Sequence, residues 1–130
     1  VTLMRRVVVD MQNMLFADAV AQTLRQFDPG FQVYVSDSPD RTEDICMNAM
    51  ANILITEVTL YTPWRIEERL RLRKNLKEKL PGCKVVFVVD ENSESGLADR
   101  VRQTMKDGLI DNFVYGSVSS TYLGAVIDTL

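Results

Sequence analysis

Residues 51–58 have the sequence Ala-Asn-Ile-Leu-Ile-Thr-Glu-Val, an apolar run that ends in a single carboxylate just before a loop. The apolar residues follow one another without polar alternation, which is typical of a strand buried on both faces of a sheet. The expected strand covers residues 53–58 and places Glu57 near its end. A strand of this kind needs helices on both sides of its sheet, so the stretch indicates an α/β domain.

Four other runs along the chain have the character of strands, and segments with helical spacing lie between all five. The expected strands are residues 6–9, 32–35, 53–58, 84–89 and 112–115. The residues expected to face the core from the five intervening or following helices are Phe16, Val20, Leu24 and Phe27, then Ile45, Met47 and Met50, then Ile66, Leu70, Leu76 and Leu80, then Leu97, Val101 and Met105, and finally Tyr122, Leu123, Val126 and Leu130. Strict alternation of strand and helix requires right-handed crossovers, so we expect a three-layer, doubly wound α/β fold with a five-stranded parallel sheet.

Length and composition predict one domain over residues 1–130. A chain of 130 residues with 46% hydrophobic and 25% charged residues can close one core but not two. The sequence contains neither an apolar stretch of about 20 residues nor the apolar core of a signal peptide, so no membrane contact and a cytoplasmic location are expected. The first residue is Val rather than Met, and we expect a domain excised from a longer protein.

Two residue types limit the chemistry that the chain can perform. It contains no His, the commonest general base and transition-metal ligand, and only two Cys residues, Cys46 and Cys83. Their spacing matches neither a disulfide framework nor a zinc site, so both are expected to be reduced structural thiols.

Four segments resemble those that surround the phosphorylation site of bacterial receiver domains. They are residues 7–12 (Val-Val-Val-Asp-Met-Gln), 52–58 (Asn-Ile-Leu-Ile-Thr-Glu-Val), 84–89 (Lys-Val-Val-Phe-Val-Val) and 108–116 (Gly-Leu-Ile-Asp-Asn-Phe-Val-Tyr-Gly). In the order of its elements the chain is similar to the receiver domain of response regulators, from residue 6 to residue 130. The resemblance implies the flavodoxin-like fold of the chemotaxis receiver.

The resemblance also assigns roles to individual residues. Glu57 stands in place of the phosphoacceptor Asp, Val89 in place of the Thr or Ser that ends the fourth strand, and Tyr115 in place of the Lys that ends the fifth. Phe113 lies at or next to the aromatic residue that couples the pocket to the partner-binding face. These three positions, Val89, Phe113 and Tyr115, are the expected equivalents of the family's switch.

The first loop allows two alignments with the family's acidic pair. In one, Asp10 and Gln12 form the acidic pocket with a single carboxylate between them. In the other, Met11 and Gln12 take the two positions and Asp10 moves into the strand. Either alignment leaves at most one strong acidic ligand at the pocket.

These substitutions argue against phosphoryl transfer. The reaction needs a carboxylate nucleophile, Mg²⁺ held by further carboxylates, and a cation or hydroxyl that neutralises the phosphoryl oxygens. Met11 removes an oxygen ligand, Tyr115 removes the ammonium, and Glu57 is one methylene longer than Asp. The expected protein is a pseudo-receiver with no catalytic residue, no metal ligand and no cofactor. Its pocket has too few oxygen ligands to bind Mg²⁺ well.

Two alternatives retain ion binding or phosphorylation at the ends of the predicted strands. Asp90 and Glu91 follow the fourth strand, and with Asp10 and Glu57 they could form a divalent-ion site or a solvated acidic rim. A working receiver with a displaced acceptor is the second alternative. A shift that makes Thr59 the acceptor would repair the spacing to Pro63, but it would bury Glu57 in the strand.

The charges and the family resemblance together predict partners. Residues 65–84 hold eight basic and three acidic residues in a chain of net charge −3. This strip is either a solvated face or a surface for an acidic partner or for DNA held by a neighbouring domain. The resemblance implies a non-enzymatic interaction module that forms a homodimer through the fourth helix, fifth strand and fifth helix. It would control transcription through a DNA-binding output domain outside this chain, or serve as an adaptor domain of an ATPase.

Overall fold

Five parallel strands form one sheet in the order β2-β1-β3-β4-β5. The computed structural model describes residues 4–130, except for the side chain of Ser120. The strands are β1 (Arg5–Asp10), β2 (Phe31–Val35), β3 (Ile53–Glu57), β4 (Lys84–Val89) and β5 (Asn112–Tyr115). The chain order reverses beside β1, so the loops after β1 and β3 diverge and open a crevice at the carboxyl edge of the sheet.

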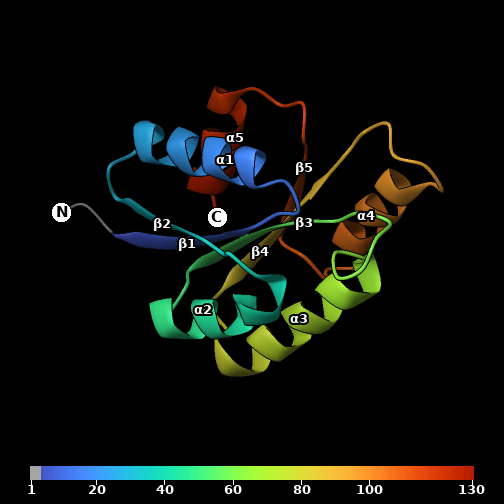
Figure 1. Cartoon of the computed structure of the whole chain (residues 1–130), viewed down its shortest axis with the longest axis horizontal. Helices are drawn as coiled ribbons and strands as arrows, with labels where there is room; N and C mark the ends of the chain where they lie inside the picture. The colour runs from blue at the N-terminus through green and yellow to red at the C-terminus, as the bar shows by residue number, and fades with distance from the viewer. Residues whose placement is uncertain (1–3) are drawn as a thin grey trace.

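Helices cover both faces of this sheet, as Figure 1 shows. Two of them, α1 (Met14–Phe27) and α5 (Ser120–Asp128), pack on one face, and α2 (Thr42–Ala49), α3 (Ile66–Lys79) and α4 (Leu97–Lys106) pack on the other. A short 3₁₀ helix, η1 (Pro39–Arg41), leads into α2. The three-layer, doubly wound α/β fold predicted from the sequence is confirmed.

The core consists of two apolar layers separated by the sheet. Val7 and Val9 face the layer under α1 and α5, whereas Val8 between them faces the layer under α2, α3 and α4. On β3, Ile53 and Ile55 face the first layer. Because side chains alternate along a strand, Asp10 is expected on the side of Val8 and Glu57 on the side of Ile55.

Several residues predicted to face the core lie at the surface instead. Large exposed side chains include those of Phe27, Met50, Met105 and Tyr122. Met50 follows the last turn of α2 in a left-handed conformation with φ of 52°, which turns the chain away from the helical face. The core positions on the helices are taken partly by small or polar residues such as Ala21, Thr42, Cys46, Arg69 and Thr104.

Element ends also differ from the sequence-based expectation by a few residues. β1 continues to Asp10, one residue beyond the predicted end, and α3 begins at Ile66 with Arg65 as its N-cap. A serine caps the last helix, because the Ser119 hydroxyl accepts the N–H of Tyr122 at 3.1 Å. Within residues 4–130 no helix has the length and apolar character needed to cross a membrane.

The contact between α1 and α5 depends on a glycine. Gly124 is buried on α5, and a Cβ at this position would lie inside the contact distance of the Phe27 ring at the end of α1. Phe27 itself is 41% exposed, so its ring lies over the helix as a cover rather than inside the core. The two helices approach closely because residue 124 has no side chain.

We expect Gly124→Ala to lower the free energy of unfolding by about 1 kcal/mol, because overpacking against Phe27 outweighs the better helix propensity of Ala. In a Phe27→Ala background the same substitution should raise stability by up to about 1 kcal/mol, because only the propensity term remains. Urea denaturation followed by circular dichroism measures both values. An effect of the same sign in the two backgrounds would contradict the role given to this contact.

Candidate functional site

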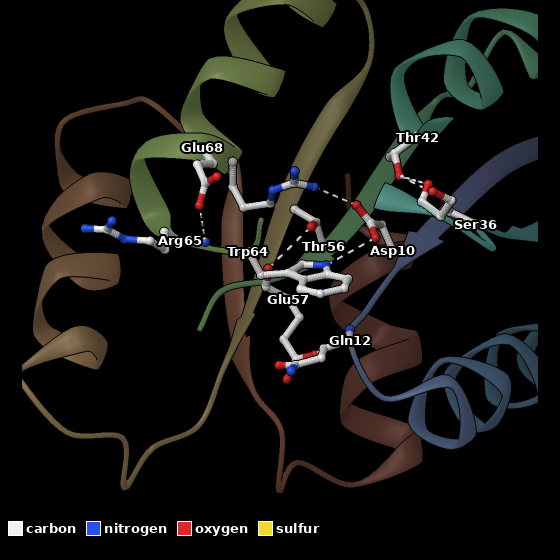
Figure 2. Close-up of polar contacts among 11 residues, drawn as sticks. Asp10, Gln12, Ser36, Thr42, Thr56, Glu57, Trp64, Arg65 and Glu68 are labelled. Atoms are coloured by element: carbon white, nitrogen blue, oxygen red, sulfur yellow. Dashed lines mark hydrogen bonds and ion pairs between the residues drawn. The ribbon is translucent and has the colours of Figure 1, made fainter. Parts of the chain in front are cut away.

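Glu57, Asp90 and Glu91 are the sequence-predicted site carboxylates that lie at the clefts at the carboxyl edge of the sheet, whereas Asp10 does not. Glu57 ends β3 and is half-buried, and its Oε1 accepts the backbone N–H of Gln12 at 2.9 Å. Figure 2 shows its side chain directed toward Gln12 and away from Asp10. Burial raises the pKa of the Glu57 carboxyl, and the backbone N–H groups of Gln12 and Asn13 offset part of this rise.

The loop after β1 holds these donors in place. The Asn13 side chain caps α1 by accepting the N–H of Phe16 at 3.1 Å. This cap fixes the chain between Met11 and Asn13, so that the Gln12 N–H points at the end of β3. Gln12 thus contributes to this contact through its backbone N–H.

Two clefts lie on either side of Glu57. The first has a volume of about 320 Å³ and is lined by Phe16, Glu57, Val88, Val89, Asp90, Glu91, Asn92, Gly116 and Ser117. The second has a volume of about 300 Å³ and is lined by Gln12, Glu57, Val58, Thr59, Leu60, Tyr61, Asp90, Ser93, Glu94 and Leu97. No lysine or arginine of the described residues lines either cleft.

Asp10 lies on the other face of the sheet, where it forms a buried ion pair. Its side chain is 1% exposed, and its Oδ2 accepts a hydrogen bond from the Arg69 Nη1 at 2.6 Å. The indole N–H of Trp64 donates to Oδ1 at 3.2 Å, as Figure 2 shows. Both carboxylate oxygens are therefore engaged within the protein, and neither faces the clefts beside Glu57.

The loop between β3 and α3 places Trp64 against Asp10. The Thr59 N–H donates to the Trp64 carbonyl at 2.8 Å, and the Trp64 N–H donates to the Tyr61 carbonyl at 2.9 Å. These two bonds close the loop on itself and direct the indole inward, over the buried pair. Tyr61 is exposed at the tip of the same loop.

The two alignments of the first loop stay predictions, but the structure limits what Asp10 can do. Asp10 pairs in register with Thr56 as part of the strand, and its carboxylate is engaged by Arg69. Among residues 4–130 no three His, Cys, Asp or Glu side chains lie close enough to hold a metal ion. With Asp10 engaged elsewhere, the donor set around Glu57 does not fit an Mg²⁺ ion, which requires near-octahedral oxygen ligands.

The three predicted equivalents of the family's switch lie on β4 and β5. Val89 is fully buried at the end of β4 and lines the first cleft. Tyr115 points toward α4, where its hydroxyl accepts a hydrogen bond from Arg102 at 2.5 Å, and its ring meets that of Phe113 edge-on at 5.6 Å. At the end of β5 the first cleft is lined by Gly116 and Ser117, so no cation from β5 reaches Glu57.

Sequence reasoning missed the part played by Arg69 and Trp64. Arg69 belongs to the basic strip of residues 65–84, but its side chain is buried on the inner face of α3. Its position three residues after Ile66 and seven before Leu76 is a position on the apolar face, and a charge there signals a buried partner. Elsewhere the strip is partly neutralised, for example by the Lys79–Glu43 pair at 3.3 Å.

The fold, though not the sequence, is similar to that of known proteins. No protein-family model matches the chain, and no curated protein matches its sequence. A response regulator from Thermotoga maritima superposes with a TM-score of 0.77 at 18% identity, over 98% of this chain and 97% of that one. A CheY-like receiver domain protein from Methanospirillum hungatei JF-1 superposes with a TM-score of 0.75 at 17% identity, over 97% and 92% of the two chains.

A third similar structure is a DNA-binding response regulator of the LuxR family from Staphylococcus aureus. It superposes with a TM-score of 0.74 at 13% identity, over 96% of this chain and 97% of that one. The chain therefore has the flavodoxin-like fold of receiver domains, as predicted from the sequence, over nearly its whole length.

We expect Arg69→Met to lower the free energy of unfolding by about 3–5 kcal/mol, because it leaves the Asp10 carboxylate buried without a partner. The double variant Asp10→Leu/Arg69→Met should recover to within about 1 kcal/mol of the wild type, since a buried pair contributes little beyond an apolar replacement. Denaturation followed by circular dichroism measures both values.

The matched control is Arg71→Met on the exposed side of α3, which should change stability by less than about 0.5 kcal/mol. A double variant as unstable as Arg69→Met alone would show that the cost comes from packing rather than from the unpaired charge.

Proposed function

We propose that this chain is a pseudo-receiver, a non-enzymatic protein-interaction domain that signals without phosphorylation. The observation that carries this proposal is the surroundings of Glu57. The carboxylate is held by the backbone N–H of Gln12, and the described residues that line its two clefts include no cation. A phosphoryl group on this side chain would add negative charge beside Asp90 and Glu91 with nothing to neutralise it.

Glu57 is also poorly suited to act as the nucleophile. Its extra methylene displaces the carboxylate by about 1 Å relative to Asp, a shift large enough to damage an in-line reaction. Without metal-binding carboxylates, the pocket has no means of drawing the phosphoryl group into line. The permanent negative charge of Glu57 instead resembles that of a phosphorylated Asp. It is about half as large, because a phosphoryl group carries a charge of nearly −2.

The partner-binding surface in this proposal is the face formed by α4, β5 and α5, through which the protein forms a homodimer. A groove of about 480 Å³ lies on it, lined by Met105, Asn112, Phe113, Val114, Tyr115, Val118, Ser119 and Tyr122. Tyr122 is 53% exposed at the rim of this groove, and Met105 is exposed on α4. Exposed aromatic and Met side chains around a groove are typical of interaction surfaces.

We further propose that the domain belongs to a longer, cytoplasmic bacterial regulatory protein and controls transcription through a DNA-binding output domain. The similarity of its fold to the LuxR-family DNA-binding response regulator supports this part of the proposal. A helix-turn-helix segment in the full-length gene would agree with this output, whereas a Walker motif would identify the domain as an adaptor of an ATPase.

A titration with beryllofluoride and Mg²⁺, followed by the fluorescence of Trp64, tests whether the pocket binds a phosphoryl mimic. Trp64 lies seven residues beyond Glu57 and is the only Trp in the chain. We expect no saturable change at millimolar ligand and no mass increase after incubation with acetyl phosphate. A Mg²⁺-dependent, saturable change that is lost in Glu57→Gln would overturn the proposal.

Sedimentation velocity over a range of concentrations tests the dimer face. We expect Tyr122→Asp to raise the dimer dissociation constant by about tenfold or more, because it places a charge against the groove. The control is Leu15→Asp, which introduces the same charge at a residue of α1 that is 82% exposed. A wild-type protein that stays monomeric throughout, or an equal effect of the two substitutions, would contradict this interface.

A further inference from the structure

Three cations follow one another along the outer side of α3. Arg71, Lys74 and Lys77 are spaced by three residues, and all of them are exposed. Residues at this spacing are neighbours on a helix surface, so the three side chains form a line about 9 Å long, which we call the cation row. The helix that carries the row lies between α2 and α4 in Figure 1.

The ion pairs of the protein leave the cation row uncompensated. Glu67 is placed four residues before Arg71, at the spacing of a helical ion pair, but its carboxylate is bound by Arg100 of α4 at 2.5 Å. No residue of the cation row forms an ion pair with a carboxylate of residues 4–130. Its charge therefore faces solvent and is accessible to a partner.

The stability of the helix does not account for the cation row. A cation in the last turn interacts favourably with the helix dipole, which explains Lys77. Arg71 and Lys74 lie in the middle of α3, where the dipole has little effect. Like charges on neighbouring positions of a helix repel each other, so the row destabilises α3 slightly. An anionic partner would remove this repulsion.

Glu78 restricts the chemistry of that partner. It is exposed and lies four residues after Lys74, so its carboxylate is beside the cation row. A nucleic acid would bring its phosphates against this carboxylate, whereas a protein segment can place a Lys or Arg there. The net charge of the chain, −3, also disfavours a long polyanion that would pass over other acidic parts of the surface.

We propose that this side of α3 binds an acidic segment of a partner protein. Carboxylates one helical turn apart contact the cation row, and a basic residue of the same segment pairs with Glu78. Exposed charges that match in this way contribute more to specificity and association rate than to affinity, so the contact is salt-dependent. The surface is separate from the Glu57 pocket and from the α4-β5-α5 face, so the inference goes beyond the proposed function and does not rest on it.

Titration of the whole chain with a synthetic acidic peptide, followed by two-dimensional amide NMR spectra, tests this inference. The probe is an Ala-rich helix of about 15 residues, with Glu at successive turns of one face and a single Lys beside them. We expect saturable shifts along α3 at about 0.1 M salt. The affinity should fall at least about tenfold at about 1 M salt, where the Debye length decreases from about 10 Å to about 3 Å.

Two triple variants with the same change in net charge locate the binding surface. The variant that removes the cation row should bind the peptide at least about tenfold more weakly, because three charge pairs are lost together. The control should bind less than about twofold more weakly, because its charges are distant from α3 and screened. The first variant is Arg71→Gln/Lys74→Gln/Lys77→Gln, and the control, at exposed positions elsewhere, is Arg25→Gln/Arg41→Gln/Lys106→Gln.

A third variant, Glu78→Gln, separates a protein partner from a nucleic acid. It should weaken binding of the peptide, because the Lys of the peptide loses its carboxylate. It should strengthen binding of a DNA duplex of similar length, because a charge that repels phosphate is removed. The wild-type chain should bind the peptide more tightly than the duplex.

The inference fails on any of three results: no saturable shift with the peptide, an equal loss of affinity in the two triple variants, or tighter binding of the duplex than of the peptide. The last result would assign the cation row to a nucleic acid. The beryllofluoride titration and the sedimentation measurements report on other parts of the molecule. Failure of the proposed function and failure of this inference are therefore distinguishable.

Discussion

The alternation of side chains along the two central strands is the constraint on which the rest of the structure depends. β1 and β3 are neighbours in register and are covered by helices on both faces, so consecutive residues enter different apolar layers. This alternation continues to the ends of the strands, where the polar residues begin. Asp10 therefore points toward Arg69 of α3, and Glu57 points toward the loop after β1, although the two residues end neighbouring strands.

Each of these carboxylates is accommodated in a different way. Asp10 is fully buried, and the protein compensates its charge with Arg69 and the indole N–H of Trp64. Glu57 lies at the open edge of the sheet, where water can reach part of the side chain, and it needs only the N–H groups of the first loop. A buried charge without a partner would destabilise the fold by several kcal/mol, whereas a half-exposed one need not. The edge of the sheet can therefore carry an uncompensated carboxylate at little cost to stability.

The fold was predictable from the sequence because the strands are continuous apolar runs and the segments between them have helical spacing. Five strands in alternation with helices allow few topologies other than the one observed. The Asp10–Arg69 pair was not predicted, because Arg69 is one of eight basic residues in the strip. Only its spacing from the apolar residues of the same helix indicates that it is buried. Phe27 and Tyr122 were predicted to face the core but are exposed. Helical spacing alone does not show where the end of a helix extends beyond the elements that pack against it.

The role of Glu57 as a substitute for the phosphoacceptor stays a prediction, but the surrounding contacts restrict how a signal could leave the pocket. In the receiver family, polar groups at the ends of the fourth and fifth strands link the pocket to the α4-β5-α5 face. Here Val89 is buried and has no side-chain polar group, and the Tyr115 hydroxyl is already bonded to Arg102 within that face. A change at Glu57 thus has no hydrogen-bonded route to α4 through these two residues. For the proposed pseudo-receiver, this favours a surface that is always available to a partner over one that is switched.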